Sequence, residues 1–364
     1  MSASVEHFGW GTSQGPIVVA ASTVNGLAAT PYQTWAFRRA EITAFYGSPF
    51  RAPSGNMLSF ASVRLIHPRV VGPDRFEALS VLAMEKLEAA LRRIPRQARM
   101  GIVLCLPERM DPERANDRDR RARRRVEGRV AGPFIEAGCN VAVRVVAKGH
   151  ASMAYGLIDV GRQMRERTLD LALVVGVDSY YDPYVLETLF ADARVLDSDS
   201  RDAFVPGEAA SALLIARPDV ARQLGFEALA QIESVGTNEE VATMDNDVGN
   251  LGLGLSRPAV AICKKMKQEK QRLAWWISDM TGETFRVHEL QIAWPRAAHL
   301  VMTPEDQLDA LPTHLGDIGA ATMPTAICIA IEGLTRGDPK GSYALVTGSS
   351  PAGARGVALV YARA

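Results

Sequence analysis

The strongest fold signal in the chain lies in Leu169–Arg217, LDLALVVGVDSYYDPYVLETLFADARVLDSDSRDAFVPGEAASALLIAR. Leu171–Val177 is apolar along its whole length, and Ala210–Ile215 shows the same pattern after a Gly-Glu turn. Strands that are apolar on both faces are typical of a sheet that helices cover on both sides. The stretch therefore predicts two buried, neighbouring strands that frame the turn.

Predicted strands and helices alternate through the rest of the chain, which is the pattern of an α/β protein. Further strands are expected at 16–22, 101–106, 140–146, 226–235, 273–278, 342–347 and 357–361, with an extended segment at 299–302. Helices are expected at 73–93, 151–167, 257–270, 283–296 and 320–334. The two halves show no visible sequence identity, so an internal duplication rests on element order alone.

Composition excludes several classes of function. The chain has 364 residues, of which 47% are hydrophobic, enough for two domains or one fused double domain. Its 41 basic and 41 acidic residues cancel, so no overall field attracts nucleic acid or a membrane. The N-terminus lacks the long apolar core of a signal peptide, and no apolar run reaches the roughly 18 residues of a membrane span. We expect a cytoplasmic protein.

The chain contains four cysteines, each among apolar neighbours and none in a CxxC pair: Cys105, Cys139, Cys263 and Cys328. This usage is typical of reduced core residues and not of a disulfide framework or a zinc site. We expect no cofactor and no metal.

Several loops resemble those of the β-ketoacyl synthases, a branch of the thiolase superfamily. Leu196–Ala210, LDSDSRDAFVPGEAA, looks like the family's Phe-Asp-x-x-Arg-Asp-Gly-Phe-x-x-Gly-Glu-Gly-Ala segment. Ser278–Glu283 is similar to its His-Gly-Thr-Gly-Thr loop, and Leu315–Ala321 to its Gly-His-x-x-Gly-Ala-Ala-Gly turn. Thr347–Gly353 fits the last Gly-rich loop. The resemblance covers most of the chain.

The resemblance implies an α/β fold in which two similar βαβ-rich halves form α-β-α-β-α layers, with an acyl pocket between them. We expect the N-terminal half at residues 1–217, including a charged insertion at about 109–132, and the C-terminal half at 218–364. It also implies a homodimer paired through the edge strand near Asn140–Val146, since an apolar edge left unpaired invites aggregation.

The resemblance places three active-site positions on residues of a different type. The family's nucleophile is a cysteine at a helix start, where the dipole favours a thiolate, and two histidines donate to the developing oxyanion. The corresponding positions hold His150, Asp279, and either Gly316 or Asp317. A carboxylate a few ångströms from an oxyanion would repel it by roughly 4 kcal/mol at an effective dielectric near 20. Ordinary condensing activity is therefore not expected.

Other interpretations of these residues stay open. His150 can be an ordinary cap or core histidine, and aspartate is favoured in turns of the Asp-x-Thr-Gly and Gly-Asp-x-Gly types. Alternatively, His150, Asp279 and Asp317 converge as a small oxygen-rich metal site or a His-Asp hydrolytic pair, although no local spacing supports this. An atypical acyl transfer or decarboxylation at these residues is the third alternative.

A supporting turn is expected at Arg201, Gly207 and Glu208. In the family the Gly-Glu turn lies behind the active site and holds its loops. A buried, hydrogen-bonded Glu208 is therefore favoured over a catalytic one.

Asp117–Arg125 carries six arginines and two aspartates in nine residues. A solvated helical face is the usual explanation of such a run. Alternatively, the arginines bind an acidic partner, such as an acyl carrier protein, because guanidinium groups pair well with phosphate and carboxylate. Nucleic acid is not expected, since no aromatic residues interleave with them. The candidate partner-binding residues are Arg118, Arg120, Arg121, Arg123, Arg124 and Arg125.

Two functional hypotheses follow. The favoured one is a noncatalytic protein of this fold that binds or stabilises a partner. The alternative is an acyltransferase or thioester-processing enzyme with altered active-site chemistry. An open apolar tunnel below His150 would favour the enzyme, whereas a space filled by side chains such as Met153 and Tyr155 would favour the binding protein.

Overall fold

The computed structural model describes residues 6–10, 15–246 and 248–362. The first half contains β1 (Glu6–Gly9), β2 (Ile17–Asn25), α1 (Pro31–Arg39), β3 (Tyr46–Arg51), β4 (Met57–Phe60), α2 (Pro73–Glu85), α3 (Glu88–Leu91), β5 (Met100–Cys105), η1 (Glu108–Met110), α4 (Asp117–Glu136), β6 (Val141–Val146), η2 (Gly149–Ala151), α5 (Ser152–Arg165), β7 (Leu171–Ser179), α6 (Pro183–Ala191) and β8 (Glu208–Ala216). The second half contains α7 (Pro218–Gln223), β9 (Ala230–Glu239), α8 (Leu253–Gln268), β10 (Trp275–Ser278), α9 (Thr284–Ala298), β11 (Gln307–Ala310), α10 (Pro312–Leu315), η3 (Gly319–Ala321), α11 (Thr322–Thr335), β12 (Tyr343–Ser349) and β13 (Ala354–Tyr361).

The same strand order occurs twice. The first set runs β6-β5-β7-β8-β2 and the second runs β11-β10-β12-β13-β9. In each set the first three strands are parallel and the last two pair antiparallel. A short antiparallel contact between the start of β2 and β9, at Ile17 and Val18, joins the two sets. A division of the chain near residue 217 is consistent with this repeat and stays a prediction.

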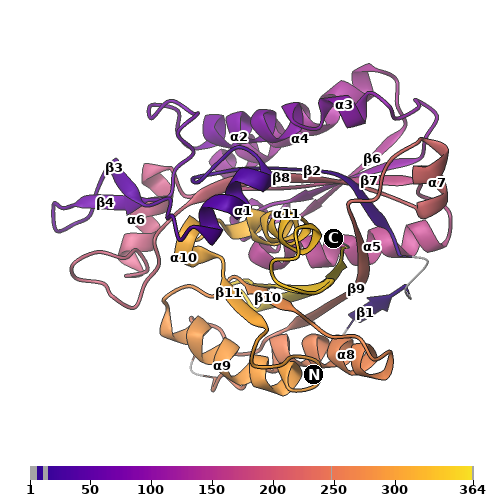
Figure 1. Ribbon diagram of the computed structural model, residues 1–364. Helices are drawn as coiled ribbons and strands as arrows, with labels where there is room; N and C mark the ends of the chain where they lie inside the picture. The colour runs from indigo at the N-terminus through magenta and orange to yellow at the C-terminus, as the bar shows by residue number, and fades with distance from the viewer. Residues whose placement is uncertain (1–5, 11–14, 247, 363–364) are drawn as a thin grey trace.

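Helices and sheets form five layers (Figure 1). α5 and α11 lie between the two sets of strands: α5 contacts β5 and β7 on one side and β9 and β13 on the other. α2 and α4 cover the outer face of the first set, and α8 and α9 cover the outer face of the second. The expected α-β-α-β-α architecture is confirmed.

The apolar pattern explains these layers. β7 and β8 are buried at every residue, as strands covered on both faces must be. In β10, Trp275 packs into the central layer, whereas its neighbour Trp276 packs under α8 and α9, because successive strand residues point to opposite faces. α11 is buried on nearly all sides, which a helix between two sheets requires.

The segment 109–132, for which a charged insertion is predicted, is largely helical. Most of it belongs to α4, the crossover helix that two parallel strands such as β5 and β6 need. Ala122, Val126, Val130 and Phe134 follow one another at four-residue spacing and are buried in the outer layer. The many arginines between them obscured this apolar stripe in the sequence.

Two predictions of local structure needed correction. The helix expected at 73–93 is divided into α2 and α3, and the segment expected to be extended at 299–302 precedes the strand, β11, which begins at Gln307. No helix among the described residues combines the length and the apolar character that crossing a membrane requires.

Candidate functional site

Two equivalent helix starts meet at the centre of the molecule. η2 precedes α5 and carries His150, and the turn before η3 and α11 carries Asp317. The His150 Nε2 and Asp317 Oδ1 atoms lie 2.7 Å apart, and the two side chains are 2% and 1% exposed. The structure therefore brings these two predicted residues into a buried hydrogen bond.

The surroundings of Asp317 favour its ionised form. Burial opposes the charge, but the charge and hydrogen bond of His150, the Arg286 guanidinium and the Gly319 N–H more than offset it and hold the pKa of Asp317 well below its usual range. The Gly319 N–H donates to Oδ1 at 2.8 Å, and an Arg286 Nη2 lies 4.0 Å from Oδ2.

Asp279 does not contact His150 in this arrangement. It follows β10 and accepts hydrogen bonds from the Ser349 N–H at 2.6 Å and from Arg286 Nη1 at 3.1 Å. Arg286, on α9, also lies 3.4 Å from Glu283. Burial opposes its charge, yet Asp279, Asp317 and Glu283 together raise the pKa of Arg286. A buried guanidinium thus joins the carboxylates of two predicted site residues.

The contacts of Arg286 leave little support for the metal hypothesis. A guanidinium already supplies the cation that the carboxylates of Asp279 and Asp317 need. Within the described residues, no group of three or more His, Cys, Asp or Glu side chains is arranged to hold a metal ion.

Gly316 has a backbone role. Its φ of +66° is left-handed, and a Cβ there would lie 2.6 Å from the Val205 carbonyl oxygen. Of the two alternatives considered from the sequence, only Asp317 places a side chain at His150.

Asp178 is a site residue that sequence reasoning missed. It lies near the end of β7 and accepts hydrogen bonds from the Ala320 N–H at 2.9 Å and from Arg109 at 3.1 Å. Burial raises the pKa of this carboxyl. A Cβ on Gly319 would lie 1.9 Å from an Asp178 oxygen, so the glycine lets the carboxylate approach the helix start. An acidic residue ending an otherwise apolar strand was the available signal.

Below His150, side chains occupy the central layer. Met153 is fully buried in the core cluster that includes Val103, Met323 and Ala154. The Tyr155 hydroxyl donates to Glu239 Oε1 at 2.7 Å, at the edge of this layer.

Three of the four cysteines are buried thiols. Cys105, Cys263 and Cys328 are buried, and burial raises the pKa of each, that of Cys263 to about 12. Cys139, expected in the core, is half-buried after the end of α4 and packs against the outer apolar cluster.

The Gly-Glu turn is held by Arg75. Glu208 is fully buried and accepts hydrogen bonds from Arg75 at 2.5 and 2.7 Å, from the Val63 N–H at 2.7 Å and from Ser179 at 2.7 Å. A Cβ on Gly207 would lie 2.5 Å from the Leu315 carbonyl oxygen, so the turn packs closely against the Asp317 loop. Arg201 is exposed, and no hydrogen bond or ion pair among the described residues links it to this turn, so its supporting role stays a prediction.

Most arginines of the run on α4 already have partners within the chain. Arg118 forms two hydrogen bonds with Asp182, at 2.7 and 2.8 Å, and Arg125 pairs with Asp74 and Glu77. Arg120 pairs with Asp117, and Arg123 lies 3.5 Å from Glu127. Arg121 and Arg124 are exposed and form no ion pair with any described residue.

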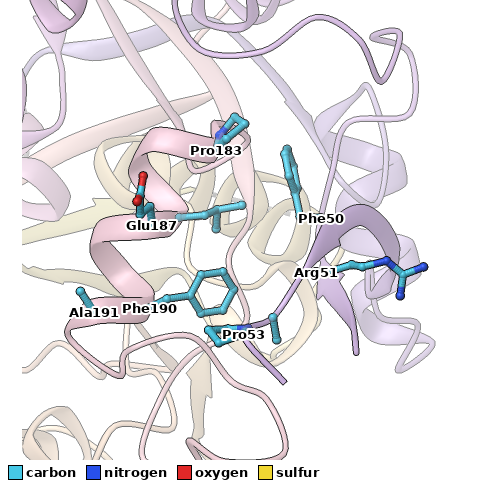
Figure 2. A pocket seen from close by; sticks show the side chains of 9 residues that line it. Phe50, Arg51, Pro53, Pro183, Glu187, Phe190 and Ala191 are labelled. Atoms are coloured by element: carbon cyan, nitrogen blue, oxygen red, sulfur yellow. The ribbon is translucent and has the colours of Figure 1, made fainter. Parts of the chain in front are cut away.

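A separate apolar pocket lies between the β3–β4 hairpin and α6. Figure 2 shows the rings of Phe50 and Phe190 facing the same space, with the guanidinium of Arg51 pointing away from it. It shares no lining residue with the His150 site.

Comparisons with known proteins show the fold. No family model matches the chain, and no curated protein matches it. Solved structures do, at a TM-score of 0.72 in each of three cases. A chain of the ishigamide ketosynthase/chain length factor is 19% identical, over 96% of this chain and 100% of that one. Another match is a chain of a structure described as a type II polyketide synthase acyl-carrier protein in complex with its ketosynthase bound to the hexaketide. It is 15% identical, over 97% of this chain and 100% of that one.

The third is the ketosynthase from module 6 of the bacillaene synthase of Bacillus subtilis 168, 13% identical over 96% of this chain and 72% of that one. These similarities define the class: the chain has the thiolase-like fold of the ketosynthases, as the loop resemblances implied. At these identities the likeness concerns the fold alone.

Proposed function

We propose that this chain is a ketosynthase-like subunit without condensing activity, and that it acts by binding a protein partner. The observation that carries the proposal is the 2.7 Å contact between His150 and Asp317, both buried, at the position where the family resemblance places a reactive thiolate. The contact occupies Nε2 of the imidazole, and Nδ1 is buried, so neither ring nitrogen is exposed to an incoming acyl group.

The surrounding charges support the same conclusion. Condensation needs hydrogen-bond donors aimed at a developing oxyanion. Here the positions that correspond to the family's two histidines carry carboxylates, and Arg286 contacts Asp279 and approaches Asp317. This guanidinium is already engaged, so an incoming thioester would have to break a buried ion-pair network.

The neighbours support a role in an assembly. One is named as a ketosynthase/chain length factor, and another as an acyl-carrier protein in complex with its ketosynthase. By analogy, the partner of this chain is an acidic protein of the acyl-carrier type, and its contact surface includes the exposed guanidinium groups of Arg121 and Arg124. A second copy of the chain pairs through β6.

Acylation provides the test of the first claim. The protein is incubated with acyl-CoA and with acyl-loaded carrier protein, beside an active ketosynthase as positive control, and intact mass is measured. We expect an acyl adduct on the control and an unchanged mass for this chain. An adduct mapped to a cysteine would overturn the proposal, and one mapped to His150 would establish the alternative, an acyltransferase.

Binding provides the test of the second claim. Carrier protein is titrated against the wild type, Arg121→Ser/Arg124→Ser, and the matched control Lys264→Ser/Lys267→Ser on α8. We expect the affinity for carrier protein to be reduced in the Arg121→Ser/Arg124→Ser variant only. The affinity of the wild type should fall as the salt concentration rises, because salt screens the contacts of these arginines. Equal affinities for all three proteins would remove α4 from the interface.

A further inference from the structure

A second charged site lies at the far end of the central layer from His150. His150 immediately precedes α5, whereas Arg165 ends that helix, and its 14 residues span about 21 Å. At this far end a cleft of about 490 Å³ is lined by residues from the last turn of α5, from the segment that follows it and from α7. Its lining residues are Trp10, Pro16, Met164, Arg165, Arg167, Arg217, Pro218, Asp219 and Arg222.

Four of the nine lining residues are arginines, and one is acidic. Asp219 is already paired: Arg217 Nη2 lies 2.7 Å from its Oδ2. Hydrogen bonds from Arg217 are the main reason why the pKa of Asp219 is lowered to about 2, so this carboxylate stays ionised and engaged. Arg217 also reaches Asp170 at 3.2 Å, and Asp170 in turn binds Arg99 at 2.7 Å.

The arginines outnumber the carboxylates that they pair with. Counting Arg99 with the four lining arginines, five guanidinium groups pair with two carboxylates among the described residues, those of Asp170 and Asp219. Arg167 is exposed, and its ion pair with Asp219 is long, at 3.8 Å, and shares a carboxylate that Arg217 already binds. Arg222 contacts only a backbone carbonyl, that of Pro218, at 3.3 Å. Arg165 donates to the Gly9 carbonyl and stacks over Phe8.

Part of the lining of the cleft is apolar. Trp10 packs edge to face on Phe8 and closely over Gly161, which has no side chain to displace it. Met164 and Pro16 are buried lining residues. A ligand seated here therefore meets guanidinium groups and, beside them, an indole ring with aliphatic groups.

We propose that this cleft binds a small organic phosphate, with the phosphate on Arg165, Arg167 and Arg222 and its apolar or aromatic part against Trp10. A phosphate offers three acceptor oxygens to guanidinium groups that approach from two helices, whereas a carboxylate offers two. The apolar part of the lining favours a phosphate that carries a ring over the free ion.

The test uses phenyl phosphate as the probe, with inorganic phosphate and phenol as its two parts. Binding to the full-length protein is measured by calorimetry at constant ionic strength, and the change in melting temperature is recorded. We expect phenyl phosphate to bind more tightly than inorganic phosphate, and phenol not to bind.

Two variants and a control locate the binding. Arg167→Ser/Arg222→Ser is expected to weaken binding of phenyl phosphate about tenfold or more, since each charged hydrogen bond contributes on the order of a factor of ten. Trp10→Leu is expected to reduce the preference over inorganic phosphate. Arg162→Ser, on α5 but outside the cleft, should match the wild type.

Failure of phenyl phosphate to bind at millimolar concentration would overturn the proposal. So would equal binding by the wild type and the double arginine variant. Because the site lies at the far end of α5 from His150, neither outcome depends on whether the protein can be acylated.

Discussion

At the residue scale, the chemistry of the site depends on which charges are paired. Asp317 contacts His150 directly, and Asp279 contacts Arg286, so both carboxylates belong to a buried ion-pair network. Breaking such a pair by removing one partner costs about 3–5 kcal/mol, because the other charge stays buried without compensation. The network is therefore expected to contribute to stability.

Replacing Asp317 with Asn tests this network through its pH dependence. Since folding lowers the pKa of Asp317, its contribution is fully present above the unfolded value of about 3.9 and is lost as pH falls toward the folded pKa. We expect Asp317→Asn to lower the free energy of unfolding by about 3–5 kcal/mol at pH 7. The difference in free energy of unfolding between the variant and the wild type should become smaller below about pH 4.

Urea unfolding at several pH values between 3 and 7 measures both effects. Glu113→Gln, at an exposed surface residue, serves as the control and should follow the wild type throughout. If the difference in free energy of unfolding between Asp317→Asn and the wild type stays constant down to pH 3, Asp317 is not ionised in the folded protein.

The Gly-Glu turn allows a second comparison between residues. Glu208→Ala leaves Arg75 buried without its carboxylate and is expected to cost about 3–5 kcal/mol. Arg201→Ser changes an exposed residue and should stay within about 0.5 kcal/mol of the wild type. Denaturant unfolding of both variants checks this, and a large effect of Arg201→Ser would support its predicted role at the turn.

At the element scale, α4 combines two functions on two faces. Its buried face carries small and branched apolar residues that pack against α2 and the sheet, whereas its exposed face carries the arginines. Ion pairs from Arg118 to α6 and from Arg125 to α2 tie this helix to its neighbours. The arginine run is thus partly a structural feature, and only part of it is free to bind a partner.

Serine substitutions separate these two roles. Arg121→Ser/Arg124→Ser should change the free energy of unfolding by less than about 0.5 kcal/mol. Arg118→Ser/Arg125→Ser should lower it by about 1–2 kcal/mol, because several partly exposed ion pairs are lost. Thermal or urea unfolding distinguishes them, and equal stabilities would show that the ion pairs of α4 contribute nothing measurable.

At the scale of the whole molecule, the free edge of β6 is the place where a second subunit is expected. Among the described residues, β6 pairs with β5 alone, and its side chains Ala142 and Val143 are exposed. An uncovered edge of this kind offers backbone groups to another strand. The first strand set would then continue into that of a partner.

Light scattering at micromolar concentration tests this assembly. We expect about twice the chain mass of 39.4 kDa for the wild type. Val143→Asp should give a monomer because it places a charge in the paired edge, whereas Val241→Asp, at another exposed valine, should not. A monomeric wild type would exclude the dimer.

The apolar pattern of the sequence alone predicted buried strands such as β7 and β8 and an α/β protein with helices on both faces of its sheet. The five-layer arrangement, the buried Glu208 and the position of His150 were predicted from the resemblance of the loops. Only the tertiary structure decided the partners: Arg75 lies 133 residues from Glu208, and Asp317 lies 167 residues from His150. A charged residue in a sequence shows no partner, since the pairing of distant side chains depends on how the helices and strands pack. For the same reason, the buried apolar face of α4 could not be recognised among its arginines. The local sequence around Arg286 also did not indicate that its side chain contacts two carboxylates.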